Sequence, residues 1–413
     1  MDMVTLVSIL LTLSAAFAYL NFRFVGLPTT IGVMFISLIF SMAALVLGKL
    51  GLVNAYSFAE NLLSRIDFNE TLMDGMLSFL LFAGALHVST KDLVKIKWTI
   101  ASLATFGVII STFVVGSLTY FLLGFLGMEI SYIYCLLFGA LISPTDPIAV
   151  MSTLKSAGIS KSLETKIAGE SLFNDGVGVV VFVVLLGIAN QPEQMSASHV
   201  LEIFVLEAIG GIIYGLLLGG IGIYLLKSVD NYQLEILITL ALVMGGYTLA
   251  LDLHTSGPIA VVVAGLMIGN HGRDHAMSET TRLRLDNFWE LLDEILNVVL
   301  FVLIGMEVLI LQFEGKYLIA GLLAIPLVLF SRLISVGTPI SILRRVTTWP
   351  YSDHVVKILV WGGLRGGISV ALALTLPAGP ERNIFLVMTY IIVTFSIVVQ
   401  GLTIGKVAKK LGA

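Results

Sequence analysis

The sequence predicts an all-α polytopic membrane protein. Of its 413 residues, 57% are hydrophobic and only 12% are charged, whereas a soluble domain carries about 25% charged residues. So few charges cannot keep water off such a large apolar surface, and lipid must therefore be the solvent for most of the chain. A soluble core of this size is excluded, and residues 1–413 are interpreted as a single integral membrane domain.

Thirteen apolar stretches are long enough to cross a bilayer, at about 20 residues each. They lie near residues 3–22, 27–48, 71–89, 97–124, 131–153, 163–190, 200–226, 233–252, 256–270, 295–311, 317–343, 355–376 and 383–408. An odd number of spans places the termini on opposite sides. The two sets of loops hold 17 and 4 basic residues, so the positive-inside rule predicts an external N-terminus and a cytoplasmic C-terminus.

The fifth span is predicted to be broken near its middle, within residues 142–147. Pro144 and Pro147 each remove a helical hydrogen bond, which frees the carbonyls of Ala140 and Ser143, and each disfavours helical geometry in the residue before it. A single proline in a membrane helix usually produces only a kink. Two prolines that bracket a Thr-Asp pair favour a discontinuous helix, and such breaks line cavities where carbonyls and helix ends bind ions.

The sixth span carries four polar residues, Glu170, Ser171, Asn174 and Asp175. At 100° per residue they fall within an arc of about 140°, which is one face of a helix. Glu170 and Asp175 lie at opposite borders of this face, so one carboxylate can hold a structural partner while the other faces an ion pathway. The alternative is that both acids are buried in their neutral forms.

The twelfth span is also predicted to be broken, at Gly362-Gly363-Leu364-Arg365-Gly366-Gly367. Four glycines around Arg365 weaken the helix, and the permanently charged guanidinium needs acceptors. Free carbonyls and the negative ends of half-helices supply such acceptors. Close packing of the glycines against a neighbouring helix is the alternative, but it leaves the arginine unexplained.

The two broken spans are seven apart and cross the membrane in opposite directions, as in inverted-topology repeats. Residues 1–190 then form a first six-helix repeat, residues 200–226 a linker helix, and residues 233–413 a second repeat. Asp146 and Arg365 are expected to compensate the dipoles of converging helix ends of opposite sign.

One further charged pair is predicted inside the bundle. Arg332 lies in the eleventh span and is expected to pair with an acid, for which Glu170 is the candidate. Such a pair holds a helix in place, because removal of one partner leaves a buried charge uncompensated. The six histidines show no metal-ligand spacing, and we expect no cofactor.

Five strings that cover spans five to twelve in order resemble the monovalent cation/proton antiporter family, specifically its NhaP-type prokaryotic branch, which is related to animal sodium/proton exchangers. They are Ser143-Pro144-Thr145-Asp146-Pro147; Gly169-Glu170-Ser171-Leu172-Phe173-Asn174-Asp175; Ser256-Gly257-Pro258-Ile259-Ala260; Phe288-Trp289 with Asn297 and Phe301-Val302-Leu303-Ile304-Gly305; and Gly362-Gly363-Leu364-Arg365-Gly366.

The resemblance implies a thirteen-helix fold in which an ion-translocating core, about residues 97–190 and 317–408, moves against a dimer domain. It implies a homodimer in the prokaryotic cell membrane, with the lipid bilayer as its surroundings and no nucleic-acid partner. The implied activity is electroneutral exchange of one Na⁺ or Li⁺ for one H⁺, in the service of pH homeostasis.

The resemblance also assigns roles to individual residues. It implies that Na⁺ binds Asp175, with Ser171 and Thr145 as further ligands, and that the site is completed by two neighbouring residues, Asp146 and Asn174. It maps a structural ion pair onto Glu170 and Arg332, and a second core arginine onto Arg365.

We interpret Asp175 as binding either a proton or a partly dehydrated cation, never both, so that competition couples the two fluxes. Exchange of K⁺ for H⁺ is left open, because cavity size and ligand number decide selectivity. From other classes, an intramembrane aspartyl protease would use Asp146 and Asp175, although its Gly-x-Gly-Asp string is absent. A channel is disfavoured, since a charge-paired core suits rigid-body movement better than a continuous wet pore.

Overall fold

The computed structural model describes residues 3–50, 71–190, 197–309, 311, 313–346 and 353–411, and within these residues all regular secondary structure is helical. The first half contains α1 (Met3–Leu20), α2 (Thr29–Lys49), α5 (Leu77–His87), α6 (Thr90–Lys95), α7 (Lys97–Ser102), α8 (Val108–Phe125), α9 (Tyr132–Leu141), α10 (Ile148–Ala157) and α11 (Lys161–Asn190).

The second half is also helical. It contains α12 (Ala197–Val205), α13 (Gly211–Lys227), α14 (Tyr232–Asp252), α15 (Gly257–Met267), α16 (Arg273–His275), α17 (Glu279–Glu307), α18 (Gly315–Val346), α19 (Asp353–Trp361), α20 (Gly367–Leu374), α21 (Pro380–Phe395) and α22 (Gly401–Lys410). Short π-helical stretches continue or join several of these helices: η1 (Asn21–Val25), η2 (Thr71–Met76), η3 (Leu103–Gly107), η5 (Leu206–Gly210), η6 (Ile268–Gly272) and η7 (Ser396–Gln400).

The prediction of an all-helical membrane protein is confirmed. Among the described residues, eight helices are long and apolar enough to cross a membrane, and the apolar helices α5 and α9 are shorter. Each of the thirteen predicted spans coincides with helical structure. Several of them are interrupted, however, so the count of thirteen crossings stays a prediction.

Both predicted helix breaks are present. The fifth span is divided into α9 and α10 by residues 142–147, and the twelfth is divided into α19 and α20 by residues 362–366. The two breaks meet, because the backbone N–H of Asp146 donates to the carbonyl of Leu364 at 2.8 Å. A polar group in a break has lost its helical partner, and here the other break supplies one.

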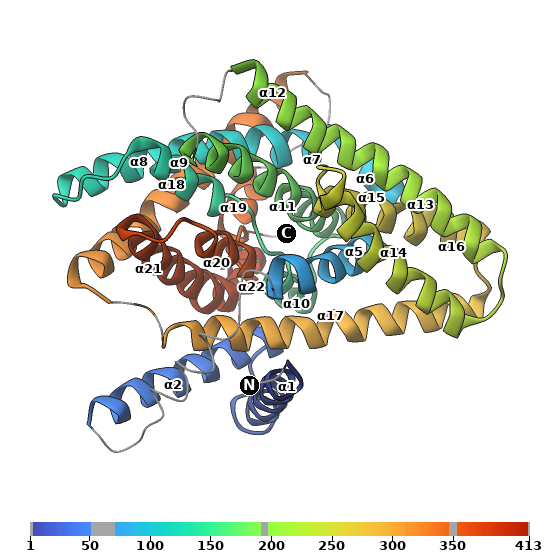
Figure 1. Cartoon of the computed structure of the whole chain (residues 1–413), viewed down its shortest axis with the longest axis horizontal. Helices are drawn as coiled ribbons and strands as arrows, with labels where there is room; N and C mark the ends of the chain where they lie inside the picture. The colour runs from blue at the N-terminus through green and yellow to red at the C-terminus, as the bar shows by residue number, and fades with distance from the viewer. Residues whose placement is uncertain are drawn as a thin grey trace.

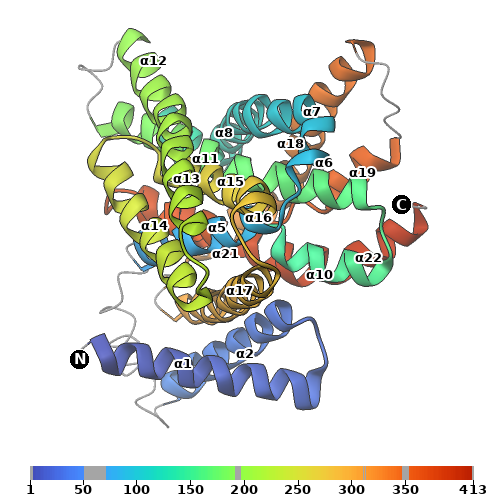
Figure 2. The same ribbon diagram turned by 90° about the vertical axis from the view of Figure 1, so that its right-hand side faces the viewer.

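The helices form two groups. Residues 97–190 and 317–408 supply α8, α9, α11, α18 and α21, which pack mainly on one another, while α5, α13, α14 and α15 pack together on the other side. In Figures 1 and 2, α17 runs between the α1–α2 pair and the remaining helices. Two serines of α2 attach it to α17: the Ser37 hydroxyl donates to Val302 O at 3.0 Å and the Ser41 hydroxyl to Gly305 O at 2.9 Å.

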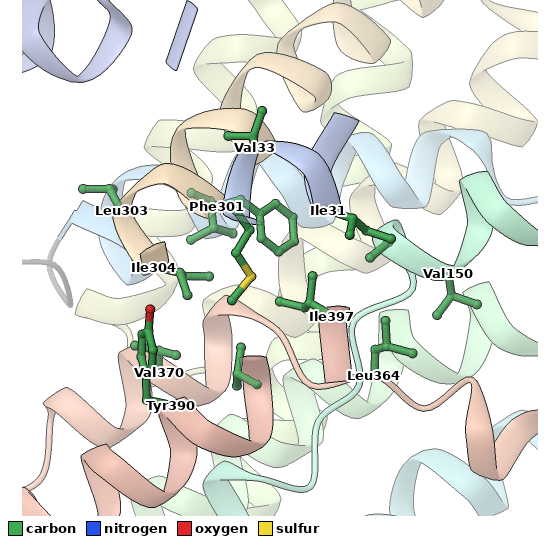
Figure 3. Close-up of a cluster of buried hydrophobic side chains, with 14 of the residues drawn as sticks. Ile31, Val33, Val150, Phe301, Leu303, Ile304, Leu364, Val370, Tyr390 and Ile397 are labelled. Carbon is green, nitrogen blue, oxygen red and sulfur yellow. The ribbon is translucent and has the colours of Figure 1, made fainter. Parts of the chain in front are cut away.

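The largest apolar core joins these parts at the level of the breaks. Figure 3 shows a cluster of side chains from α2, α10, α17, the second break, α20, α21 and η7, with Ile31, Val33, Val150, Phe301, Leu303, Ile304, Leu364, Val370, Tyr390 and Ile397 labelled. Side chains such as Phe301 and Leu364 are fully buried. The helix breaks are therefore held within a closely packed interior.

Helices α8 and α9 approach closely because glycines face one another across their contact. A Cβ added to Gly139 would collide with the carbonyl of Thr112, and one added to Gly116 would lie 3.0 Å from the carbonyl of Cys135. Cys135, the single cysteine of the chain, is fully buried in this seam. Small residues permit such backbone contacts between membrane helices.

The close approach of α8 and α9 implies that one added methyl group in their contact should destabilise the protein. Gly139→Ala should lower the free energy of unfolding by about 1–3 kcal/mol, because the new methyl group meets backbone that cannot move away freely. The thermal midpoint of the purified protein in detergent measures the effect. Gly124→Ala, also on α8, is the matched control, since a Cβ there meets nothing within 4 Å. Equal midpoints for the two variants would contradict the packing described here.

Candidate ion-binding site

The guanidinium of Arg365 lies at the carboxyl end of α9, where the fifth span is broken. Its side chain is 1% exposed, and its Nη1 donates to Ser143 O at 2.6 Å and to Pro144 O at 3.0 Å. The Ser143 carbonyl, predicted to be freed by a proline, thus finds its partner in the guanidinium. The prediction for Ala140 was wrong, because its carbonyl accepts the Ser143 N–H at 3.2 Å and closes a last, tighter turn.

Asp146 lies at the amino ends of two helices, α10 and α20. Its Oδ1 accepts the backbone N–H of Ile148 at 2.8 Å, in the first turn of α10. Gly366, the residue before α20, approaches the same carboxylate so closely that any Cβ would collide with it. An anion therefore faces the amino ends of α10 and α20, and a cation faces the carboxyl end of α9, as favourable interaction with helix dipoles requires.

Three of the predicted site residues form a buried hydrogen-bonded network between the first break and α11. The Thr145 hydroxyl lies 3.0 Å from the Ser171 hydroxyl, and Asn174 Nδ2 donates to Thr145 Oγ1 at 2.8 Å. Asn174 Oδ1 also accepts the Thr145 backbone N–H at 3.2 Å. Asn174 thereby uses both ends of its amide to fix Thr145, so its role in this geometry is to orient a neighbour.

Asp175 faces a cavity of about 110 Å³ that the first break also lines. Asp146 and Thr145 line it, as does Asp293 of α17, and the remaining lining, as far as the structure describes the chain, includes no Lys, Arg or His. Asp175 itself is 7% exposed. A buried carboxylate is costly unless a cation or a proton neutralises it, and none of the described residues that line this cavity has a basic side chain to do so.

Glu170 and Arg332 are brought together in the bundle interior. Glu170 Oε1 lies 2.6 Å from Arg332 Nη1, with both side chains buried. The Arg332 guanidinium also donates to Leu359 O, at 3.4 Å from Nε and 3.3 Å from Nη2. The pair thus connects α11 to α18 and to α19, while Asp175, five residues further along α11, faces the cavity.

Two polar residues of the cavity were missed by the sequence analysis. Asp293 precedes the tenth predicted span by two residues, and its signal was the recurrence of polar residues at helical spacing, with Glu290, Glu294 and Asn297 on the same face of α17. Ser369, in the first turn of α20, is 1% exposed and its hydroxyl has no hydrogen-bond partner among the described residues. It lines the same cavity and adds an oxygen to it.

The few polar groups in a mostly apolar lining determine which ligands fit the cavity. Carboxylates and hydroxyls are the donors that hard, oxygen-binding cations prefer. Two acids, Asp146 of the first break and Asp175 of α11, line it together with the hydroxyl-bearing residues Thr145 and Ser369. The arrangement is suited to holding a small cation or a proton, one in place of the other.

The buried pair of Glu170 and Arg332 is expected to contribute to the stability of the folded protein. Arg332→Met should cost about 3–5 kcal/mol of folding free energy, because it leaves the Glu170 carboxylate buried and uncompensated. Addition of Glu170→Gln to this variant should recover part of the loss, since no buried charge then remains. The yield of monodisperse protein and its thermal midpoint measure both effects.

The control for this prediction is Lys95→Met, which breaks the exposed pair of Lys95 with Asp92. Exposed pairs contribute little to stability, and this variant should behave as the parent does. A single Arg332→Met variant as stable as Lys95→Met would contradict the structural role of the buried pair.

Comparison with known proteins supplies the family. A family model described as "Sodium/hydrogen exchanger, transmembrane" matches residues 11–410. The chain is 51% identical over 413 residues to the Na⁺/H⁺ antiporter NhaP of Pseudomonas aeruginosa, covering all of this chain and 97% of that protein. It is 36% identical to the Na⁺/H⁺ antiporter NhaH of Halobacillus aidingensis, over 86% of each chain.

A solved structure supports the fold independently. The sodium proton antiporter MjNhaP1 of Methanocaldococcus jannaschii superposes with a TM-score of 0.79 at 21% identity, over 100% of both chains. At that identity the likeness concerns the fold alone. The match over nearly the whole length and the identity to full-length relatives together show that this chain belongs to the transmembrane sodium/hydrogen exchanger family.

Proposed function

We propose that this protein is a secondary antiporter that exchanges Na⁺ or Li⁺ for H⁺ across the membrane, with Asp175 as the shared binding group. The observation that carries the proposal is the position of Asp175 in a cavity that is lined by further acids and, among the described residues, by no basic side chain. Family membership supports the same activity, since relatives that match most of the chain are named Na⁺/H⁺ antiporters.

Coupling follows from competition for one carboxylate. Desolvation disfavours the charged form of a buried acid, so Asp175 stays ionised only when a metal cation is beside it and otherwise holds a proton. Thr145 and Ser171 are the proposed further Na⁺ ligands. Their hydroxyls lie 3.0 Å apart, and Ser171 is one helical turn before Asp175 on α11. Asn174 and Asp146 complete the site, the first by fixing Thr145 and the second by adding negative charge to the cavity.

The place where the two helix breaks meet, here called the crossing, is the proposed hinge point of an alternating-access movement. Residues 97–190 and 317–408 form a group that packs mainly on itself, which supports movement as one body against the other helices. The Glu170–Arg332 pair keeps α11 in register with that body, and Asp146 and Arg365 compensate the helix ends that meet at the crossing.

The cellular setting is proposed from the family and from charge. The loop charges favour a cytoplasmic C-terminus and an external N-terminus, in the inner membrane of a prokaryotic cell. We further propose a homodimer that serves pH homeostasis and requires no cofactor.

A protease is the weaker candidate. Asp146 and Asp175 do share a cavity, but Asp146 is engaged with the α10 backbone and the family match concerns exchangers. Peptide cleavage by the purified protein would favour the protease, and a conductance that persists without an imposed proton gradient would favour a channel.

Loss of one carboxylate should stop the exchange. Asp175→Asn should reduce Na⁺-driven proton movement in proteoliposomes to the rate of protein-free vesicles, because an amide neither takes up a proton nor balances a cation. Asp252→Asn, which removes a carboxylate at the exposed end of α14, should retain the parental rate. Exchange at parental speed in Asp175→Asn would refute the proposed site.

Stoichiometry and ion choice can be read in the same vesicles. With one carboxylate exchanging one cation for one proton, no net charge crosses the membrane, so an imposed voltage of either sign should leave the initial rate unchanged. Na⁺ and Li⁺ should each drive the proton flux, and K⁺, tested in turn, decides the remaining alternative. A rate that follows the voltage would overturn the electroneutral scheme.

A further inference from the structure

A second, larger cavity lies next to the ion site. It has a volume of about 820 Å³ and is lined by parts of α1, α2, α10 and α17. Pro147, Ile148 and Asp293 line both this cavity and the smaller cavity that holds Asp175. Asp293 therefore lies where the two spaces meet.

The second cavity faces the end of the molecule that carries the basic loops. Lys155, in the last turn of α10, lines its rim and forms an ion pair with Glu164 at 3.4 Å. The exposed acids Glu290 and Glu294 line it as well. By the loop charges this is the cytoplasmic end, and Asp293 lies where this cavity meets the one that holds Asp175.

One face of α17 carries the polar lining of this cavity. Glu290, Asp293, Glu294 and Asn297 recur at intervals of three and four residues, which places them on one side of the helix over about 10 Å of its length. All four line the cavity. The face changes along the helix from exposed acids to the buried Asn297, which is 1% exposed.

Two buried oxygens in the lining have no hydrogen-bond partner among the described residues. They are Oδ1 of Asn297 and Oγ of Ser14, a residue of α1 that is 4% exposed. The Asn297 amide is oriented by its own Nδ2, which donates to Asp293 O at 2.8 Å, so the carbonyl oxygen is the end left over. A buried polar atom without a partner is costly, and a carbonyl oxygen is a ligand that hard cations accept.

We propose that Asp293 and Asn297 form a second cation-binding site, which takes the monovalent cation from the acidic side of α17 before it reaches Asp175. The inference builds on the proposed antiport and adds two residues of α17, a helix that holds none of the predicted site residues. The carboxylate of Asp293 supplies the charge, and the Asn297 carbonyl oxygen supplies a neutral ligand. Glu290 and Glu294 raise the local cation concentration at the rim.

The first experiment measures binding without transport. Purified Asp175→Asn protein is titrated with Na⁺, and ²³Na NMR relaxation reports the bound ion. If the second site exists, this protein still broadens the sodium signal in a saturable way, and the double variant Asp175→Asn/Asp293→Asn does so at least about threefold less. Equal broadening by the two proteins would overturn the proposal, whatever the transport assays show.

The second experiment measures sidedness. In everted vesicles, where the cytoplasmic face is outside, Asp293→Asn should raise the Na⁺ concentration for half-maximal exchange about five- to tenfold, as expected for loss of a charge that concentrates the ion. Asp293→Glu, which keeps the charge, should restore most of the affinity.

Glu279→Gln is the matched control, because it removes one acid from the same helix about 21 Å earlier along its axis, where it lines neither cavity. It should leave the Na⁺ dependence unchanged. An unchanged value in Asp293→Asn, or an equal rise when Na⁺ is supplied at the other face, would overturn the second site. Neither result would affect the test of the antiport itself, which depends on Asp175→Asn alone.

Discussion

Two interrupted helices can exist inside a bilayer only if the polar backbone groups of each interruption find partners, because lipid supplies none. In this protein each break supplies hydrogen-bond partners for polar groups of the other. The Asp146 N–H donates to Leu364 O, and Arg365, next in the chain, donates to the carbonyls of Ser143 and Pro144. The rest of the site depends on this pairing of the two breaks, since it holds extended backbone, carbonyl dipoles and carboxylates in one place.

Helix α11 carries Asp175 and is attached both to the crossing and to the rest of the core. Asn174 ties α11 to the first break through Thr145, and Glu170 ties it to the opposite side of the core through Arg332. Asp175 lies on the same helix and lines the cavity. Its carboxylate can therefore change its occupant while the helix that carries it stays fixed on two sides.

Much of this was predictable because its causes are local. Prolines and glycines that interrupt an apolar span identify a break from sequence alone, and the scarcity of intramembrane charges left few partners for Arg332. The carbonyl of Ala140 was mispredicted because a tighter final turn satisfied it. Asp293 and Ser369 were missed for a different reason. The polar spacing along α17 identifies a polar face that carries Asp293, but which cavity that face or Ser369 lines depends on the helices across it, and a single helix does not contain that information.

The seam between α8 and α9 has a practical consequence. Its cysteine is the only one in the chain and is fully buried, so water-soluble thiol reagents should not reach it in the folded protein. Spin labels attached to cysteines introduced at exposed positions would then report from those positions alone. Pairs of such labels on the two helix groups would reveal directly, as distance distributions, how far one group travels relative to the other during a transport cycle.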